Sequence, residues 1–414
     1  MSVLFSLIIF STTIYSSNSS LNVGASFRNI TPDPLLPVSG GVGIPNPVEM
    51  KKGELTTRAI VIVSNDTKIA LVSIDNLGVP KIIGDKIRSR IVDIKPENIL
   101  ISATHTHSAP DLYGFADENG NSGIDLSYVD FVIDQTSDAI NEALNNIQPS
   151  YLKTAVDEAK GKIAYNYYAP KLYDPRCGLI QFISADNQKP IATLVNYAIH
   201  PEVIGSDRGI CTPDLVGPLY NKIESEIGGI ALFVNSAQGG MVTADNRLDN
   251  GKEANDWNEC IRIGELLAAE SIRIISNADV QKSPEINIKS KEVVLPVESE
   301  LMQFILKHSK LNYGIDENKV FTTLNIIKLG DAQILTIPGE ALPNIGYYLK
   351  RKMNTQHPFL FGLTNDAFGY ILTKEDFNSF KTYNYITRTS LGEKTGDIII
   401  NAAMDLINKS SFSE

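Results

Sequence analysis

Short apolar runs bounded by Gly, Pro, Asn or Asp recur along the chain, and such runs are typical of buried strands. They predict strands over residues 21–30, 57–64, 68–74, 179–183, 190–199, 229–235, 293–297, 325–329, 333–337 and 359–364. Asn65 and Asp66 separate the second and third of these strands, which predicts a hairpin.

Other segments place apolar residues three or four positions apart, which is the spacing of an amphipathic helix. This spacing predicts helices over residues 79–92, 127–147, 212–226, 255–276, 301–310, 341–353 and 396–408. Strands and helices mix throughout, with no short repeat, low-complexity linker or block of like charges. We therefore expect an α/β fold, a single large domain of mixed β-sheets flanked by helices.

The stretch from Asn98 to Asp111, NILISATHTHSAPD, joins an apolar run to two of the chain's five histidines. Side chains two positions apart in a strand point to the same face, so we expect His105 and His107 to face one cavity. Pro110 lacks a backbone donor and is expected to end the strand. Imidazole binds metals and titrates near neutrality, which favours metal or general-base chemistry. The alternative is one histidine bonded to backbone and one at the surface.

Polar residues also follow other predicted strands, at His200, at Asn235, at Glu340 and between Asn365 and Tyr370. Loops at strand ends, held by a rigid scaffold, often carry the chemistry of a protein. Two imidazoles, a carboxylate and a further oxygen donor meet the requirements of catalytic zinc, so a mononuclear metal site at the strand ends is one hypothesis. The alternative for Glu340 is that a carboxylate suits a helix N-terminus on electrostatic grounds.

The composition narrows the class of protein. Of the 414 residues, 43% are hydrophobic and 21% charged, which is ordinary for a globular protein with a large core. The formal net charge of −11, without any basic stripe, argues against a nucleic-acid partner. Cys177, Cys211 and Cys260 are widely spaced and form no CxxC motif, so neither a disulfide framework nor a cysteine zinc site is expected.

The N-terminus differs from the rest of the chain. A short apolar run, Val3 to Phe10, is followed by Ser- and Thr-rich residues, which is typical of a signal peptide. The run lacks the usual preceding Lys or Arg, and the alternative is a disordered leader. We expect residues 1–20 to be one of these, and the mature protein to be exported, extracellular or at the cell surface.

Four segments in order resemble the neutral (alkaline, non-lysosomal) ceramidase family in its N-terminal catalytic domain. They are SATHTHSAP at 102–110, NYAIHP at 196–201, PGE at 338–340 and NDAFGYILTKEDF at 365–377. The resemblance implies a catalytic domain over residues 21–414, and we expect no C-terminal immunoglobulin-like domain.

The resemblance also implies roles for single residues. One Zn²⁺ per chain would be bound by four ligands, namely His105, His200, Glu340 and Tyr370. The implied reaction is hydrolysis of an N-acyl amide, ceramide to sphingosine and fatty acid or a related lipid amide. His107, Tyr385 and Thr243 would be the catalytic residues that face the substrate. A lipid-like substrate is compatible with peripheral membrane contact, and the oligomeric state is not implied.

Two segments depart from the family's pattern. The family's glycine-acid-x-serine-proline segment is QGGMVTADN at 238–246, where either Thr243 or Val242 stands at the serine position and only Thr243 keeps a hydroxyl. The family's active-site arginine is missing, with Tyr167 following the asparagine instead. Two alternatives therefore stay open: an exported non-catalytic zinc-containing binding protein on the same fold, and a zinc hydrolase of unrelated esters or peptides.

Overall fold

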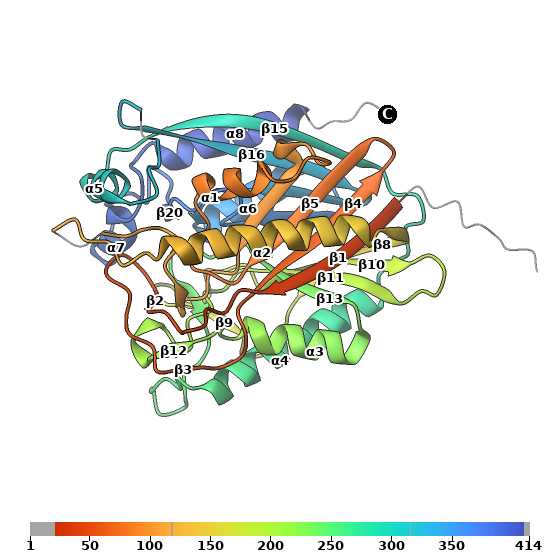
Figure 1. The fold of residues 1–414 in the computed structure, drawn as a ribbon, viewed down its shortest axis with the longest axis horizontal. Helices are drawn as coiled ribbons and strands as arrows, with labels where there is room; N and C mark the ends of the chain where they lie inside the picture. Colours follow the sequence, from red (N-terminus) through yellow and green to blue (C-terminus); the bar gives the residue numbers. More distant parts are fainter. Residues whose placement is uncertain (1–20, 117–118, 315, 410–414) are drawn as a thin grey trace, which may run out of the picture.

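The structure, a computed structural model, describes residues 21–116, 119–314 and 316–409. The predicted signal peptide or leader, residues 1–20, lies outside the described residues. The described chain forms four layers, in which two β-sheets pack face to face and helices cover both outer faces (Figure 1). This arrangement confirms the predicted single α/β domain of mixed sheets flanked by helices.

The larger sheet has eight strands in the order β13-β11-β10-β8-β1-β4-β5-β6. Its pairs are antiparallel except β5 with β6 and β11 with β13, which are parallel. The strands are β1 (Leu21–Asn29), β4 (Thr56–Ser64), β5 (Thr67–Ile74), β6 (Ile99–Ala103), β8 (Gln148–Glu158), β10 (Arg176–Ser184), β11 (Pro190–Tyr197) and β13 (Ile230–Asn235). The predicted hairpin between β4 and β5 is confirmed, with Ser64 paired to Thr67.

The smaller sheet has four strands in the order β15-β16-β17-β19. These are β15 (Ile286–Pro296), β16 (Lys319–Leu329), β17 (Ala332–Thr336) and β19 (His357–Phe361). Side chains from both sheets share one apolar layer, which includes Ile60, Phe182, Ile334 and Phe359. Gly178 of β10 lets the sheets approach closely, because a Cβ atom there would lie 2.6 Å from the Phe359 ring.

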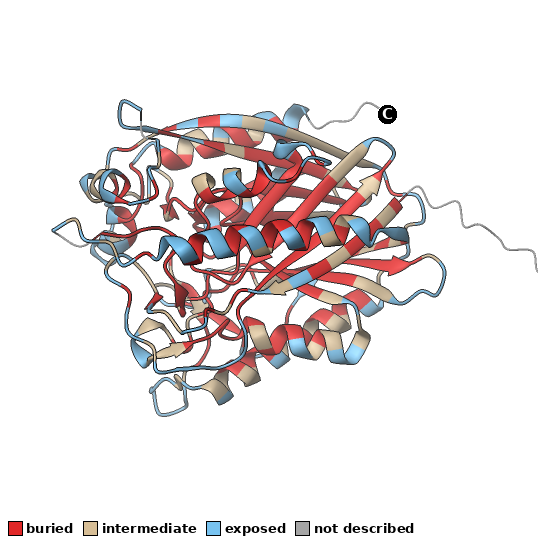
Figure 2. Cartoon of the chain, viewed as in Figure 1, coloured by how far each residue is buried: buried red, intermediate tan, exposed pale blue. Residues whose placement is uncertain are grey.

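Helices cover the outer faces of both sheets with their buried sides inward (Figure 2). Helix α2 packs on β1 and β4, α3 and α4 cover the half of the large sheet that contains β10 and β13, and α6 and α8 cover the small sheet. The helices are α1 (Lys81–Arg88), α2 (Leu126–Asn145), α3 (Val216–Ile227), α4 (Trp257–Ser276), α5 (Glu300–His308), α6 (Pro343–Lys352), α7 (Asn384–Arg388) and α8 (Thr395–Lys409). None of these, in the part of the chain that the structure describes, is both long and apolar enough to cross a membrane.

The large sheet folds back on itself, so that its two edges meet. Strands β1 and β8 share only two residue pairs, and this narrow join divides the sheet into two halves. The halves are held together at the opposite edges by side chains that reach the backbone of β13. Ser73 of β5 donates a hydrogen bond of 2.5 Å to the Phe233 carbonyl, and Arg58 of β4 donates one of 3.0 Å to the Ala231 carbonyl. As a result, the ends of β6 and β11 lie close together.

A buried ion pair fastens α6 to the loop before β10. Lys350 Nζ lies 3.0 Å from Asp174 Oδ2, and both side chains are almost fully buried. Arg176 donates a hydrogen bond of 2.7 Å to the other carboxylate oxygen. Burial alone would raise the pKa of Asp174, but the charges of Lys350 and Arg176 outweigh it and lower the pKa from 3.8 to about 2.

The lowered pKa predicts how this ion pair contributes to stability at different pH values. An aspartate whose pKa is depressed by folding stabilises the protein above its unfolded pKa, and this stabilisation is lost as the pH falls through the folded value. We expect Asp174→Asn to lower the free energy of unfolding at pH 7, and the difference from wild type to shrink by about 2 kcal/mol between pH 5 and pH 2. Urea unfolding across this range measures the difference.

Asp186→Asn, at the exposed turn between β10 and β11, is the matched control and should show no such pH-dependent difference. A constant difference between wild type and Asp174→Asn from pH 7 to pH 2 would contradict the assignment.

Candidate metal and catalytic site

The segment that carries His105 and His107 is not the extended strand that the pattern predicts. Strand β6 ends at Ala103, and His105 has a φ of 72°, which is uncommon for a residue with a side chain. A backbone hydrogen bond of 2.9 Å from His105 to the Asn76 carbonyl holds this conformation. The chain therefore turns at His105, yet both rings still face one cavity, with centroids 4.8 Å apart.

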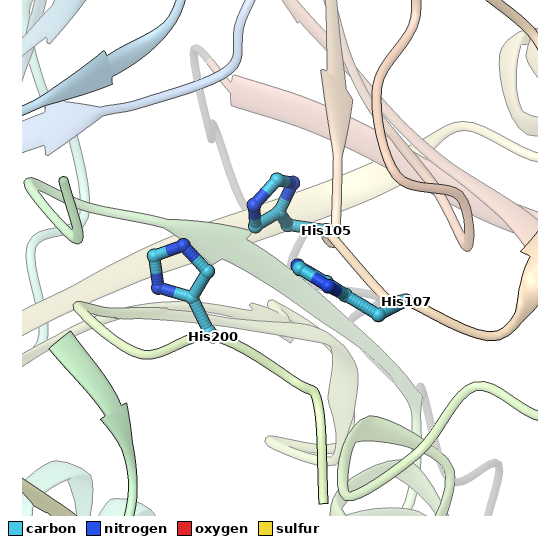
Figure 3. A group of neighbouring side chains, drawn as sticks. All are labelled: His105, His107 and His200. Carbon is cyan, nitrogen blue, oxygen red and sulfur yellow. The ribbon is translucent and has the colours of Figure 1, made fainter. Parts of the chain in front are cut away.

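Asn235 joins the two strand ends that supply the histidines. Its amide nitrogen donates to the carbonyls of Ile199 and Thr104, at 2.7 and 3.2 Å, and these residues immediately precede His200 and His105. The centroid of the His200 ring lies 4.8 Å from that of His105 and 5.7 Å from that of His107. Figure 3 shows the three rings converging from the two segments.

Glu340 reaches the same place from the segment that follows β17 of the smaller sheet. It lies in β18 (Glu340–Ala341), which follows β17 and pairs with β20 (Tyr370–Ile371), so that Glu340 and Tyr370 are register partners. Gly239 allows the close approach of this backbone, because a Cβ atom there would lie 2.2 Å from the Glu340 carbonyl oxygen. Glu340 Oε2 is 3.0 Å from His200 Nε2 and 3.5 Å from His105 Nε2.

The other nitrogen of each imidazole faces a backbone carbonyl. His105 Nδ1 lies 2.6 Å from the Leu77 oxygen, and His200 Nδ1 lies 2.7 Å from the Val242 oxygen. A carbonyl oxygen only accepts, so each Nδ1 carries a proton. Each Nε2 points at the buried carboxylate, to which it donates a hydrogen bond when protonated, and when deprotonated it leaves a lone pair for a cation at the same place. Two lone pairs and an anionic oxygen around one point fit a bound cation, and carbonyl-anchored imidazoles are usual among metal ligands.

The electrostatics of Glu340 and the histidines that face it also favour binding of a cation. Burial alone would raise the pKa of Glu340, but the charge of His105 and the hydrogen bonds from both histidines hold it well below its usual range. Burial alone would lower the pKa of His200, but the hydrogen bond to Glu340 and nearby carboxylate charge raise it to about 9. The carboxylate thus stays ionised and attracts either protons or a metal ion to the imidazoles.

His107 differs from the other two histidines because its buried Nε2 has no hydrogen-bond partner. Its Nδ1 lies 3.5 Å from Glu202 Oε2. Burial, and next the neighbouring His105 and His200, lower the pKa of His107 well below its ordinary value. The ligand atoms of the three histidines all lie within 4.8 Å of one another, so two overlapping donor sets can hold a metal: the three imidazoles, or His105 and His200 with Glu340.

A cavity of about 50 Å³ opens beside the imidazoles and Glu340. Tyr370 and Tyr385 form part of its wall, with ring centroids 5.9 Å apart. The Tyr370 hydroxyl donates to Met241 Sδ at 3.4 Å. Burial raises the pKa of Tyr370 well above its ordinary value and that of Tyr385 to about 12, so both phenols stay protonated near neutral pH.

Thr243 is next to His200 along the backbone but outside the cavity wall. It belongs to β14 (Val242–Ala244), which pairs with β9 (Ala164–Asn166), and its own partner there is Tyr165. Its backbone forms a bridge with His200, but Thr243 is not part of the cavity wall. The structure thus brings together His105, His107, His200, Glu340, Tyr370 and Tyr385, and the catalytic role of Thr243 stays a prediction.

Sequence reasoning missed several residues of the site. Glu202, two positions after His200, faces His107, and its place next to the His200-Pro201 pair was the available signal. Gly40 and Gly41 form part of the cavity wall and belong to a glycine-rich stretch, Val38 to Pro45. Tyr113 also belongs to the wall, and it follows the histidine segment closely in the sequence. No Lys or Arg belongs to the described wall.

Comparison with known proteins finds solved structures with a similar fold but no match to a protein family or a curated protein by sequence. No protein-family model and no curated protein matches the chain. The crystal structure of neutral ceramidase from Pseudomonas aeruginosa matches with a TM-score of 0.76 and 16% identity, over 95% of this chain and 75% of that chain. A ceramidase complexed with C2 matches with a TM-score of 0.75 and 16% identity, over 94% of this chain and 75% of that chain. The chain therefore has a ceramidase-like fold.

Proposed function

We propose that this protein is a zinc-dependent amidohydrolase that cleaves an N-acyl amide, either ceramide or a related lipid amide. One observation carries the proposal: the Nε2 atoms of His105 and His200 converge on Glu340 Oε2 while both Nδ1 atoms are held by backbone carbonyls. The ceramidase-like fold supports the same reaction class. His105, His200, Glu340 and Tyr370 are the proposed ligands of one Zn²⁺.

The residues around the cavity have the properties that amide hydrolysis needs. Bound zinc supplies Lewis-acid polarisation of the amide carbonyl. The neutral His107 ring is part of the cavity wall and its buried Nε2 has no hydrogen-bond partner, so Nε2 can take a proton from the attacking water. As the water oxygen bonds to the carbonyl carbon and the C–N bond breaks, His107 returns this proton to the leaving nitrogen. The protonated Tyr385 can donate a hydrogen bond to the carbonyl oxygen.

The surface beside the cavity suits an apolar substrate. Contacts between rings run from Tyr167 through Tyr168 and Tyr383 to Phe380, with centroids 6.0, 5.4 and 5.2 Å apart. Tyr167 and Phe380 are 61% and 56% exposed, and the cavity-wall residue Tyr385 is 49% exposed. Exposed apolar groups that gather in this way mark binding surfaces. Because a cavity of about 50 Å³ holds only a few water molecules, an acyl chain has to lie along this surface.

A second candidate is a non-catalytic zinc-containing binding protein on the same fold. The position of Thr243 favours it, since the one hydroxyl that could replace the family's serine is not part of the cavity wall. The missing arginine favours it too, because no Lys or Arg takes its place on the described wall. Measuring turnover separates the two candidates.

The first experiment measures metal content. We expect elemental analysis of the purified protein to find one zinc per chain, and His105→Ala, His200→Ala and Glu340→Ala to lose it, because each variant removes a donor from the buried set. His107→Ala should keep the zinc. His308→Ala, an exposed histidine on α5, is the matched control.

Well-folded wild-type protein without bound metal would refute the zinc site. Loss of zinc from His107→Ala would instead assign His107 to the ligands.

The second experiment measures amide hydrolysis. We expect fatty acid to be released from at least one member of a panel of ceramides and N-acyl amino acids, and a chelator to abolish this release until zinc is restored. His107→Ala should lower kcat by about a hundredfold or more at unchanged zinc content, because it removes the proton acceptor. If the zinc-loaded protein binds these amides without any turnover, the binding-protein candidate is correct.

A further inference from the structure

Glu202 is a carboxylate beside the cavity that the reaction described above does not use. It follows His200 and Pro201 at the end of β11, and its side chain is 26% exposed. Among the described residues, no Lys or Arg pairs with it; it faces His107, and its charge contributes to the raised pKa of His200. A partly buried carboxylate without a Lys or Arg partner needs another explanation for its position.

Glu202 lies on one side of the His107 ring. Glu202 Oε2 lies 3.5 Å from Nδ1, while Nε2, on the other side of the ring, is buried without a partner. A carboxylate accepts, so the ring nitrogen that faces it carries the proton. The single proton of the neutral imidazole then sits on Nδ1, and Nε2 is left with its lone pair directed away from Glu202. Such contacts commonly tighten only when substrate is bound.

We propose that Glu202 is a positioning residue, which holds His107 in the Nδ1–H tautomer and so presents the Nε2 lone pair to the reacting water. This inference rests on the proposed function. Imidazoles that act as bases are usually oriented in this way, because the group that binds one nitrogen decides which nitrogen is protonated. The backbone carbonyl of Gly40 also interacts with the His107 ring, so the test has to separate the two acceptors.

Substitutions at Glu202 separate the effect of its carboxylate on the His107 ring from the effect of the Gly40 carbonyl. Glu202→Ala leaves only the Gly40 carbonyl, whereas Glu202→Gln keeps an oxygen acceptor of the same reach and removes the charge. Asp207→Ala, on the same loop and with a side chain that is 78% exposed, is the matched control. All variants are compared as zinc-loaded protein, and zinc content and thermal stability show that each remains intact.

The first readout needs no substrate. Two-bond ¹H–¹⁵N correlation spectra of protein labelled at histidine report which nitrogen of each ring carries the proton, and the chain has only five histidines to assign. We expect the Nδ1–H tautomer for His107 in wild type, Glu202→Gln and Asp207→Ala. Glu202→Ala should shift the ring towards the Nε2–H tautomer. An unchanged tautomer in Glu202→Ala would overturn the proposal, because Gly40 alone would then be sufficient.

The second readout is the kinetics of amide hydrolysis. Glu202→Ala should lower kcat by about tenfold to a hundredfold, with KM changed by less than about twofold, because the residue acts through His107 rather than on the substrate. Glu202→Gln should recover most of this loss. Equal impairment of both variants would overturn the proposal by showing that the charge matters and not the acceptor.

An incorrect proposed function and an incorrect role for Glu202 would give different experimental results. If wild type hydrolyses no amide, the reaction assigned to the site is wrong, whereas the tautomer spectra still decide whether Glu202 orients His107.

Discussion

The arrangement of the site depends on one buried carboxylate. Glu340 is only 5% exposed, yet two imidazole nitrogens from distant segments point at the same oxygen of its side chain. A lone buried charge would be very costly, so the carboxylate requires positive or metal partners around it. The carbonyls of Leu77 and Val242 meet the second nitrogen of each ring and thereby fix both rings in place. The result is a preformed set of donors rather than a set that must rearrange around a ligand.

This convergence is possible because of how the sheets are joined. The large sheet bends where β1 meets β8, which brings the ends of β6 and β11 together, and Asn235 ties the two ends by hydrogen bonds to both. Strand β18, which follows β17 of the smaller sheet, supplies Glu340 against Gly239, where any side chain would collide with the backbone. Four segments that are remote in sequence thus meet at one point. Around them lie a cavity wall without Lys or Arg among the described residues, exposed aromatic side chains and Glu202, and the proposed amide hydrolysis rests on this setting.

Much of the fold could be predicted from the periodicity of apolar residues. The hairpin of β4 and β5 and the helices α2, α4 and α8 follow the sequence pattern closely, because each buries one continuous face. Strand β8 was missed, since its sequence QPSYLKTAVDE mixes charged residues with a broken alternation. The predicted strand over residues 293–297 covers only the end of β15 for a similar reason. The rest of β15 is largely polar and partly exposed, and its pairing with β16 keeps it extended. Such strands are stabilised by their neighbours rather than by their own composition.

The sequence by itself determined which residues are available for chemistry: two histidines near the end of one apolar strand, a third after another, and a carboxylate and a tyrosine after two more. It also determined the α/β fold class, because periodicity is a local property. Only the tertiary structure decided how these residues meet. The turn at His105, the protonated Nδ1 atoms, the absence of Thr243 from the cavity wall and the place of Glu202 beside His107 all depend on contacts between segments far apart in the chain. Such contacts leave no local pattern, since sheet curvature and close backbone approach arise from packing of the whole domain.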